Sequence, residues 1–409
     1  MLVRTLTKVP DDLDFADPDV HQRDDIRAIW REMRERGEIA WQEPRGERSG
    51  FWVIARYAQA MEILRDSEGF ASSGGNVLDT AAHQGDTAAG SMAPVTDGTG
   101  HRALRRVLAR LLSPSMLGRA RLSVESTARD LIRDDDETDV LDLGATAAIL
   151  PVAAICGLLG VPGSDRERVL HLARSVLTIP QERAAATDPR IARAELIQYL
   201  AALVSRRKDD RGDDGISILL DSSIQGRPMT DHQIVMNCYS LIFGGIETTR
   251  LTITTGLHAL IERPDAWQRV MIGDADLNVA VEEMLRWGSA AMHLARTATA
   301  ERKIGGQTIS PGEIVSVWNI SANFDEREMA DPEVFDIDRT PNRHIAFGNG
   351  VHFCPGAAFA RMEITTFLRQ LRESVAGIEL AGPPSVIRST FLGGVDVLPV
   401  RLTRKGALA

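Results

Sequence analysis

The sequence predicts a protein that is mainly α with small β-sheets, folded as one large domain over residues 1–409. Three observations support this fold class. Most of the chain carries helical apolar periodicity, strand-like runs are few and short, and no Ser-, Gly- or Pro-rich linker or internal repeat divides the chain. A length of 409 residues would by itself suggest two or three domains, so the single domain depends on the missing linker.

Composition narrows the class of protein. The 44% apolar content is ordinary for a soluble globular protein. With 47 basic and 57 acidic residues, the net charge of −10 argues against a nucleic-acid partner and against anionic membranes. Residues 1–8 carry no apolar run long enough for a signal peptide or a membrane span, so we expect a cytoplasmic location.

Cysteine usage agrees with this class. The chain has three cysteines and no CxxC pair, which argues against a disulfide scaffold or a zinc knuckle. Cys156 and Cys238 lie in apolar or helical patterns and are expected to be small buried hydrophobes. Cys354 lies instead in a Gly-rich stretch.

The first hundred residues predict one helix, two strands and a long loop. A charged helix is expected over Val20–Glu35, followed by strands at 39–42 and 50–56. Residues 66–100 are rich in Gly, Ser, Ala, Thr and Asp with little periodicity. A loop of this length is usually functional or mobile, although its middle part could be a plain surface loop. Further helices are expected at 117–135, 147–160, 164–178 and 192–209, with a loop over 179–190.

A long helix is predicted from Thr230 to Glu262. Thr230 and Gln233 have the form of a capping box, and about 32 residues at 1.5 Å each give a helix of roughly 48 Å. In its middle, Gly244 and Gly245 precede Glu247, Thr248 and Thr249. Glycine costs about 1 kcal/mol in a helix, and threonine hydroxyls bend helices by bonding back to carbonyls. Tight helix packing with a surface-facing Glu247 is the simpler alternative, but it leaves the threonine pair unexplained.

The stretch from Phe347 to Gly356 contains three glycines around Cys354 and leads directly into a helical pattern. A cysteine in a Gly-rich loop at a helix N-terminus has its thiolate stabilised by backbone N–H groups and the helix dipole. Cys354 is therefore a candidate metal ligand or nucleophile, and a structural thiol is the alternative.

The pattern Phe-Gly-x-Gly-x-His-x-Cys-x-Gly over residues 347–356 resembles the haem-binding loop of the cytochrome P450 family. The resemblance implies a triangular prism of helices, with haem b between the long central helix and the cysteine loop. Cys354 would be the thiolate ligand of the iron, and Phe347, Gly348 and Gly356 would shape its loop. Thiolate ligation pushes electron density onto iron and favours cleavage of dioxygen.

Other segments match the family in the expected order. The central Gly244–Thr249 stretch resembles the oxygen-binding groove, with Glu247 and Thr248 as the acid–alcohol pair that holds water and relays protons from solvent. The resemblance assigns the haem propionates to His101, Arg105, Arg296 and His344. It gives Glu283, Arg286 and Arg339 a structural role and no chemistry.

The resemblance also places the substrate pocket. Its expected lining residues are Phe243, Gly244, Ile246, Ala291, Met292, Leu294 and Phe391. The family usually has a proline near Ala290 or Ala291, which this chain lacks. The resemblance therefore does not determine the backbone course of that wall of the pocket. His293 is expected at the surface, with a polar contact to substrate as the weaker alternative.

The function implied is a haem-thiolate monooxygenase that inserts one O2-derived oxygen atom into a small apolar substrate, by hydroxylation or epoxidation, in secondary-metabolite biosynthesis. A peroxide-driven haem-thiolate enzyme and a ligand sensor without turnover are the alternatives. Because the chain has no flavin-binding region, electrons would come from a ferredoxin or flavodoxin with its reductase. A basic patch would receive this partner, although each arginine could equally be plainly solvated: Arg102, Arg106, Arg110, Arg343 and Arg361.

Pro355 departs from the family, which usually has Leu, Ile or Val after the cysteine. Proline has no N–H, so one possible hydrogen bond to the thiolate sulfur is missing. Because such bonds set the potential of an iron site, we predict an electron-rich thiolate and a lowered potential. A proline that merely fits the turn is an equal alternative.

Overall fold

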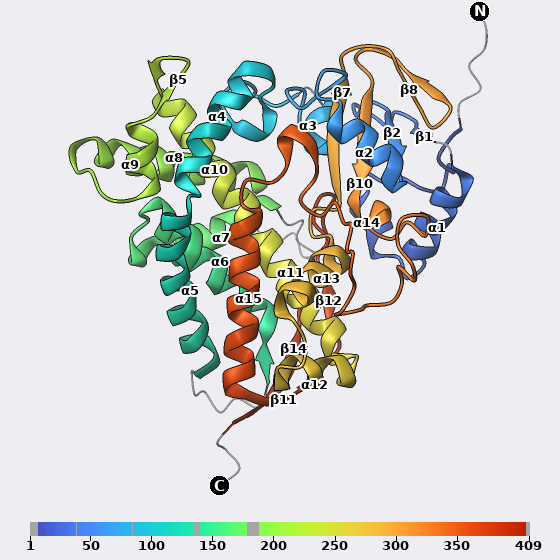
Figure 1. The fold of residues 1–409 in the computed structure, drawn as a ribbon. Coiled ribbons are helices and arrows are strands. Elements are labelled where there is room, and N and C mark those ends of the chain that lie inside the picture. The colour runs from blue at the N-terminus through green and yellow to red at the C-terminus, as the bar shows by residue number, and fades with distance from the viewer. Residues whose placement is uncertain (1–6, 38, 84, 134–139, 178–187, 406–409) are drawn as a thin grey trace, which may run out of the picture.

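The computed structural model describes residues 7–37, 39–83, 85–133, 140–177 and 188–405, and is mainly helical with small sheets, as the sequence predicts (Figure 1). The helices are α1 (Ile26–Arg36), α2 (Tyr57–Arg65), α3 (Leu78–His83), α4 (Gly98–Leu111), α5 (Pro114–Arg133), α6 (Leu143–Leu159), α7 (Arg166–Leu177), α8 (Pro189–Asp209), α9 (Gly215–Leu220), α10 (Asp231–Gly245), α11 (Glu247–Ile261), α12 (Pro264–Ile272), α13 (Leu277–Gly288), α14 (Asn319–Ala322) and α15 (Ala357–Ser374). Short 3₁₀ turns are η1 (Pro18–Gln22), η2 (Ala93–Val95), η3 (Gly163–Asp165) and η4 (Gly350–His352).

The largest sheet joins strands from residues 40–71 to strands from residues 293–318. Its order is β1 (Ala40–Gln42), β2 (Phe51–Ile54), β10 (Ile314–Trp318), β7 (His293–Ala298) and β3 (Phe70–Ala71). β2 and β10 are parallel, with Phe51 opposite Ile314. A second sheet pairs β11 (Val375–Leu380), β14 (Pro399–Arg404) and β4 (Leu141–Asp142). The remaining strands form hairpin-like pairs: β5 (Ser223–Ile224) with β6 (Arg227–Pro228), β8 (Arg302–Ile304) with β9 (Gln307–Ile309), and β12 (Ser385–Val386) with β13 (Val395–Val397).

The main core lies among the helices, away from the large sheet. Figure 1 shows α15 lying along α5 with α10 and α11 behind it, while β1, β2, β7 and β10 occupy the other side of the molecule. Buried apolar side chains from α4 to α15 form one continuous cluster. A separate aromatic cluster under the sheet contains Phe15 and Trp30, whose rings stack at 4.3 Å, together with Trp318.

The long central helix differs from its prediction at one residue. Its capping box is present, since Thr230 Oγ1 accepts from Gln233 N at 3.2 Å and Gln233 Oε1 accepts from Thr230 N at 3.0 Å. However, the helix is divided at Ile246 (φ −83°, ψ −67°) into α10 and α11. Thr248 Oγ1 donates to the Gly244 carbonyl at 2.6 Å, so the threonine bonding expected from the sequence accompanies the interruption.

The amino-terminal prediction needs two corrections. The helix expected over Val20–Glu35 is instead the 3₁₀ turn η1 followed by α1, because the chain is extended at Arg23 (φ −70°, ψ 140°). The predicted loop 66–100 contains β3, α3, η2 and the start of α4. α3 has only six residues, too few for a recognisable period. The predicted helices at 117–135, 147–160, 164–178 and 192–209 correspond to α5, α6, α7 and α8, and most of the predicted loop 179–190 lies outside the described residues.

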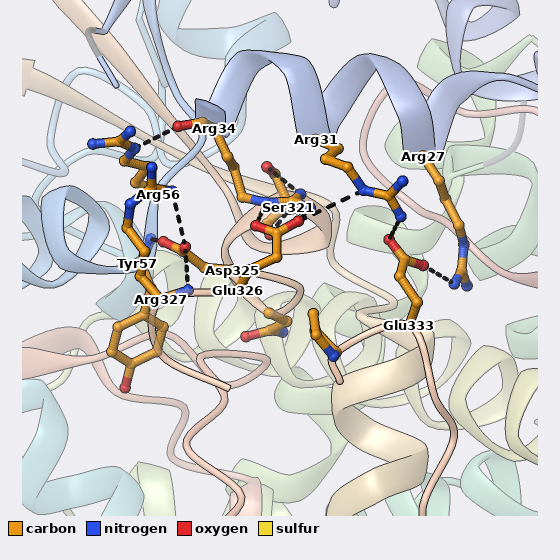
Figure 2. Close-up of polar contacts among 12 residues, drawn as sticks. Arg27, Arg31, Arg34, Arg56, Tyr57, Ser321, Asp325, Glu326, Arg327 and Glu333 are labelled. Carbon is orange, nitrogen blue, oxygen red and sulfur yellow. Dashed lines mark hydrogen bonds and ion pairs between the residues drawn. The ribbon is translucent and has the colours of Figure 1, made fainter. Parts of the chain in front are cut away.

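Polar contacts fasten α1 to the segment that precedes the cysteine loop (Figure 2). Arg27 and Arg31 both bond Glu333, at 3.1 and 3.2 Å. Arg34, whose side chain is 1% exposed, donates twice to Glu326 and also to the Ser321 hydroxyl. A buried arginine of this kind needs such partners to offset its lost hydration.

Within the described ranges, no helix is both long and apolar enough to cross a lipid bilayer.

Candidate active site

The cysteine loop holds Cys354 in one position at the start of α15. The Cys354 N–H donates to the Phe347 carbonyl at 2.9 Å, which closes the loop on itself. Gly348 and Gly350 have φ of 68° and 69°, the left-handed region that glycine adopts at little cost. A Cβ on Gly350 would lie 2.2 Å from the Leu64 carbonyl oxygen, so the loop also requires glycine for its close approach to α2.

The surroundings of the Cys354 thiol affect its pKa in both directions. Burial raises its pKa, while the Gly356 backbone N–H and the guanidinium groups of Arg105 and Arg361 oppose that rise. Arg361 is itself fixed by two bonds to Glu282, at 2.5 and 2.8 Å. The sulfur therefore has hydrogen-bonding and positively charged neighbours that favour its thiolate form.

Cys354 faces a cavity of about 260 Å³ that separates the cysteine loop from α10 and α11. The cavity wall is mostly apolar. It includes the predicted haem-loop residues Phe347, Gly348, Cys354 and Gly356, together with Pro355. On the opposite side, Gly244, Thr248 and Thr252 succeed one another at intervals of four residues, as positions on one helical face do. No atom lies within 4 Å of a Cβ built on Gly244, so this position opens onto free space.

Of the predicted substrate residues, five lie in the cavity wall: Phe243, Gly244, Ala291, Leu294 and Phe391. Two do not. Ile246 is fully buried in the helical core at the helix break, and Met292 packs in the cluster under the sheet while its N–H donates to the Phe391 carbonyl at 2.9 Å. Met292 precedes β7, and its side chain lies against Gly393 and not in the cavity wall.

His293 is not at the surface, which corrects the sequence prediction. Its side chain is fully buried, and its Nε2 accepts a hydrogen bond from Leu78 N at 2.9 Å. The ring lies against Trp318, with centroids 4.8 Å apart. His293 therefore anchors α3 to β7 in the core. This burial could not be predicted from the sequence, because it depends on α3, which the sequence does not indicate.

Four basic side chains from three elements gather at one end of the cavity: His101, Arg105, Arg296 and His352. The rings of His101 and His352 lie 4.0 Å apart, and His352 Nε2 bonds Asp97 at 3.1 Å. Burial lowers the pKa of His101 to about 4 and that of Arg296 to about 10, so Arg296 remains a cation at neutral pH. Among the described residues, neither Arg105 nor Arg296 forms an ion pair with a carboxylate.

His344 is elsewhere, contrary to the propionate role predicted for it. Its Nε2 lies 3.1 Å from Glu282 of α13, and it is not part of the cavity wall. His352 occupies the cavity instead. The signal for His352 was present in the sequence, since it is the histidine two residues before Cys354 within the recognised pattern.

Glu247 does not face solvent or the cavity. Its side chain is fully buried and bonds Arg250 at 2.7 and 3.0 Å, and Arg250 also bonds Asp396 at 2.8 Å. Arg174 of α7 approaches Glu247 to 3.9 Å. The alternative of a surface-facing Glu247 is therefore wrong. A direct route for protons from solvent to this carboxylate is not visible, because two arginines cover it.

Glu283, Arg286 and Arg339 lie together, as expected. Arg286 donates to both carboxylate oxygens of Glu283 at 2.7 and 2.8 Å, and Arg339 Nε lies 3.2 Å from Glu283. Glu283 also accepts from Asp336 N and Asn342 Nδ2. This cluster is buried and ties α13 to the segment leading into the cysteine loop.

The proposed partner-binding arginines divide into two groups. Arg361 and Arg343 are engaged with Glu282 and Glu328, and Arg110 donates to Ser222. Arg102 and Arg106 lie exposed on the outer face of α4.

The residues present fit a haem. A thiol faces an apolar cavity, and buried cations without carboxylate partners lie at one end, where the two propionates of a haem would neutralise them. A thiol, an apolar slot, paired cations and a hydroxyl-lined helix groove together define a haem-thiolate protein of the oxygen-activating class.

Comparisons with known proteins agree. The cytochrome P450 family model matches residues 174–272 and 277–373. Cytochrome P450 NovI of Streptomyces niveus is 37% identical over 96% of both chains, and the steroid C26-monooxygenase of Mycobacterium tuberculosis (strain H37Rv) is 30% identical over 98% of this chain and 95% of its own. The crystal structure of P450 OxyD, involved in the biosynthesis of vancomycin-type antibiotics, superposes with a TM-score of 0.88 at 32% identity, covering 96% of this chain and all of that one. The chain belongs to the cytochrome P450 family and is a monooxygenase.

Proposed function

We propose that this monooxygenase hydroxylates or epoxidises a small apolar molecule of secondary metabolism. The observation that carries the proposal is the apolar cavity between Cys354 and the Gly244–Thr248 groove. One relative supports the metabolic setting, since OxyD is described as involved in the biosynthesis of vancomycin-type antibiotics. The four apolar side chains Phe243, Ala291, Leu294 and Phe391 would hold the substrate.

The chain's own residues divide the remaining work. Cys354 would ligate the iron of haem b, and His101, Arg105, Arg296 and His352 would neutralise its carboxylates. The bound haem supplies the reduction of O2 and the oxygen transfer. The Thr248 hydroxyl donates its hydrogen bond to the Gly244 carbonyl. Its oxygen therefore remains free to accept a hydrogen bond from a water in the groove. The two polar groups Asn76 and Ser240 lie in the same wall and would orient a polar substituent of the substrate.

Electrons would arrive from a ferredoxin or flavodoxin with its reductase. The exposed Arg102 and Arg106 on α4 lie on the same short helix as Arg105, which faces the cavity. An acidic redox protein that docks over α4 would therefore bring its cofactor close to the haem. We propose that the enzyme works with this partner in the cytoplasm.

The test is the carbon monoxide difference spectrum of the dithionite-reduced protein. Wild type should show the strongly red-shifted Soret band of a thiolate ligand, and Cys354→Ser should lose it. A histidine-type band in wild type would mean that Cys354 is not the ligand. Once the thiolate band is found, a screen of apolar natural-product scaffolds for displacement of the distal water, read as a spin shift, identifies the substrate class.

A further inference from the structure

Asn237 of α10 is a buried amide side chain that none of the roles above uses. It is 1% exposed and lies outside the cavity wall. Its Oδ1 accepts a hydrogen bond from Ala93 N at 3.2 Å, and its Nδ2 donates to the Ser91 carbonyl at 2.8 Å and to the Gln233 carbonyl at 2.7 Å. The reversed amide would set donors against an N–H and an acceptor against two carbonyls, so these contacts fix one orientation.

Asn237 connects two parts of the cavity wall. The segment 91–95, which contains η2, contributes Ala93 and Pro94 to this wall. α10 contributes Ser240 and Leu241, about one turn after Asn237. The hydrogen bonds of Asn237 therefore hold η2 at a fixed distance from α10, although 144 positions separate Asn237 from Ala93 in the sequence.

Few other contacts fix the position of the segment 91–95. Met92 and Val95 are buried in the helical core, but hydrophobic contact is non-directional and does not determine an exact position. Within the described ranges, Asn237 is the only residue beyond positions 86–97 that hydrogen-bonds the backbone of residues 91–95. The segment is also closed internally, since Val95 N donates to the Met92 carbonyl at 3.1 Å. Two bonds from one side chain therefore position the segment as a unit.

We propose that Asn237 is a positioning residue for substrate size: it sets the width of the cavity between η2 and α10, and so determines how bulky a substrate fits there. A substrate too large for this width must displace η2 and break both hydrogen bonds from Asn237 to the segment 91–95. The proposal rests on the proposed function, in which this cavity holds the apolar substrate.

Two azoles of different size test the proposal on the full-length, haem-loaded protein: imidazole and 4-phenylimidazole. Both bind haem iron through a ring nitrogen, so the red shift of the Soret band gives a Kd for each. Asn237→Leu removes the hydrogen bonds at similar side-chain volume. It should tighten 4-phenylimidazole relative to imidazole by about fivefold to tenfold, the equilibrium change that corresponds to one hydrogen bond. A ratio that stays at the wild-type value, or shifts in favour of imidazole, overturns the proposal.

Two further variants separate positioning from general loosening. Asn237→Asp keeps the shape of the side chain but turns an oxygen toward the Ser91 and Gln233 carbonyls, so it should shift the ratio in the same direction. Ser217→Ala removes a buried hydrogen bond from Gly212 N at 2.9 Å, outside the cavity wall, and should leave the ratio unchanged. If Ser217→Ala shifts the ratio as far as Asn237→Leu does, the proposal is wrong.

Hydrogen exchange in wild type tests the hydrogen bonds without any variant. With mass spectrometry resolved to single residues, the Ala93 amide should exchange as slowly as the amides in the middle of α10, because its N–H is bonded to a fully buried side chain. Exchange at the rate of an exposed loop overturns the proposal, even if the Asn237 variants do not fold.

The two proposals fail separately. If wild type lacks the thiolate band with carbon monoxide, the proposed function is wrong, and exchange of the Ala93 amide still decides whether Asn237 holds η2. If wild type and Asn237→Leu both show that band while the ratio of azole affinities stays the same, only the role of Asn237 is wrong.

Discussion

Removing the Glu283 carboxylate should lower the free energy of unfolding of this protein by several kcal/mol, roughly, as expected for a broken buried ion pair. Glu283 is fully buried and accepts from Arg286 twice, from Asp336 N and from Asn342, with Arg339 at 3.2 Å. Glu283→Ala leaves the fully buried Arg286 guanidinium without a counter-charge. Breaking a buried pair in this way costs about 3–5 kcal/mol of the free energy of unfolding.

The chain offers a matched control. Glu125 pairs with Arg121 at 2.8 Å, but these side chains are 28% and 54% exposed, so Glu125→Ala should cost about 0.5 kcal/mol or less. Both variants can be followed by urea unfolding of the haem-loaded protein, using tryptophan fluorescence and the Soret band, and Trp287 next to Arg286 reports on the site directly. A Glu283→Ala loss within about 1 kcal/mol of the Glu125→Ala loss would refute the reasoning, because burial would then add nothing.

Three further outcomes are expected. Gly350→Ala must adopt φ near 69° and place a Cβ 2.2 Å from the Leu64 carbonyl oxygen. It should therefore lower the free energy of unfolding by about 1–3 kcal/mol more than Gly226→Ala, which changes a left-handed glycine with open space around it. If both variants lose haem equally on heating, this expectation is wrong. Burial, and then the charge of His21, lowers the pKa of His293 from 6.5 to about 3. The free energy of unfolding should therefore fall by about 1.4 kcal/mol for each pH unit below 6.5, because the unfolded chain binds the proton more readily. His293→Asn should flatten this slope in urea titrations. Pro355→Leu should raise the reduction potential of substrate-free enzyme, by about 60 mV for a new N–H bond to sulfur of ~1.4 kcal/mol, and an unchanged potential in spectroelectrochemistry would show that the proline only shapes the turn.

Local patterns predicted the parts of the fold that local forces decide. The capping box at Thr230 agrees with the structure, because side-chain bonds within one turn determine it. The strands expected at 39–42 and 50–56 correspond to β1 and β2 to within two residues, because a short run of β-formers is a local signal. α3 was missed because six residues held by the His293 ring depend on a contact 215 positions away. That residues 1–409 form one domain stays a prediction.

The candidate site shows the same division. A ten-residue pattern located Cys354, and the chain order of the matching segments located Thr248, Arg105 and Arg296. The sequence could not show that Glu247 is covered, since Arg250 and Asp396 meet only after β13 returns to α11. It also could not separate His344 from His352, because eight residues of loop decide which of them enters the cavity.

The clasp between α1 and the segment before the cysteine loop has a consequence for synthesis on the ribosome. Arg27, Arg31 and Arg34 leave the exit tunnel some 300 residues before Glu326 and Glu333, their partners. β2 likewise cannot pair with β10 until β10 has been synthesised. α1 must therefore stay undocked, with its arginines hydrated, until the chain has been synthesised as far as Glu333. The cysteine loop and α15 follow directly in the chain, so closure of this clasp and completion of the haem pocket are adjacent events during translation.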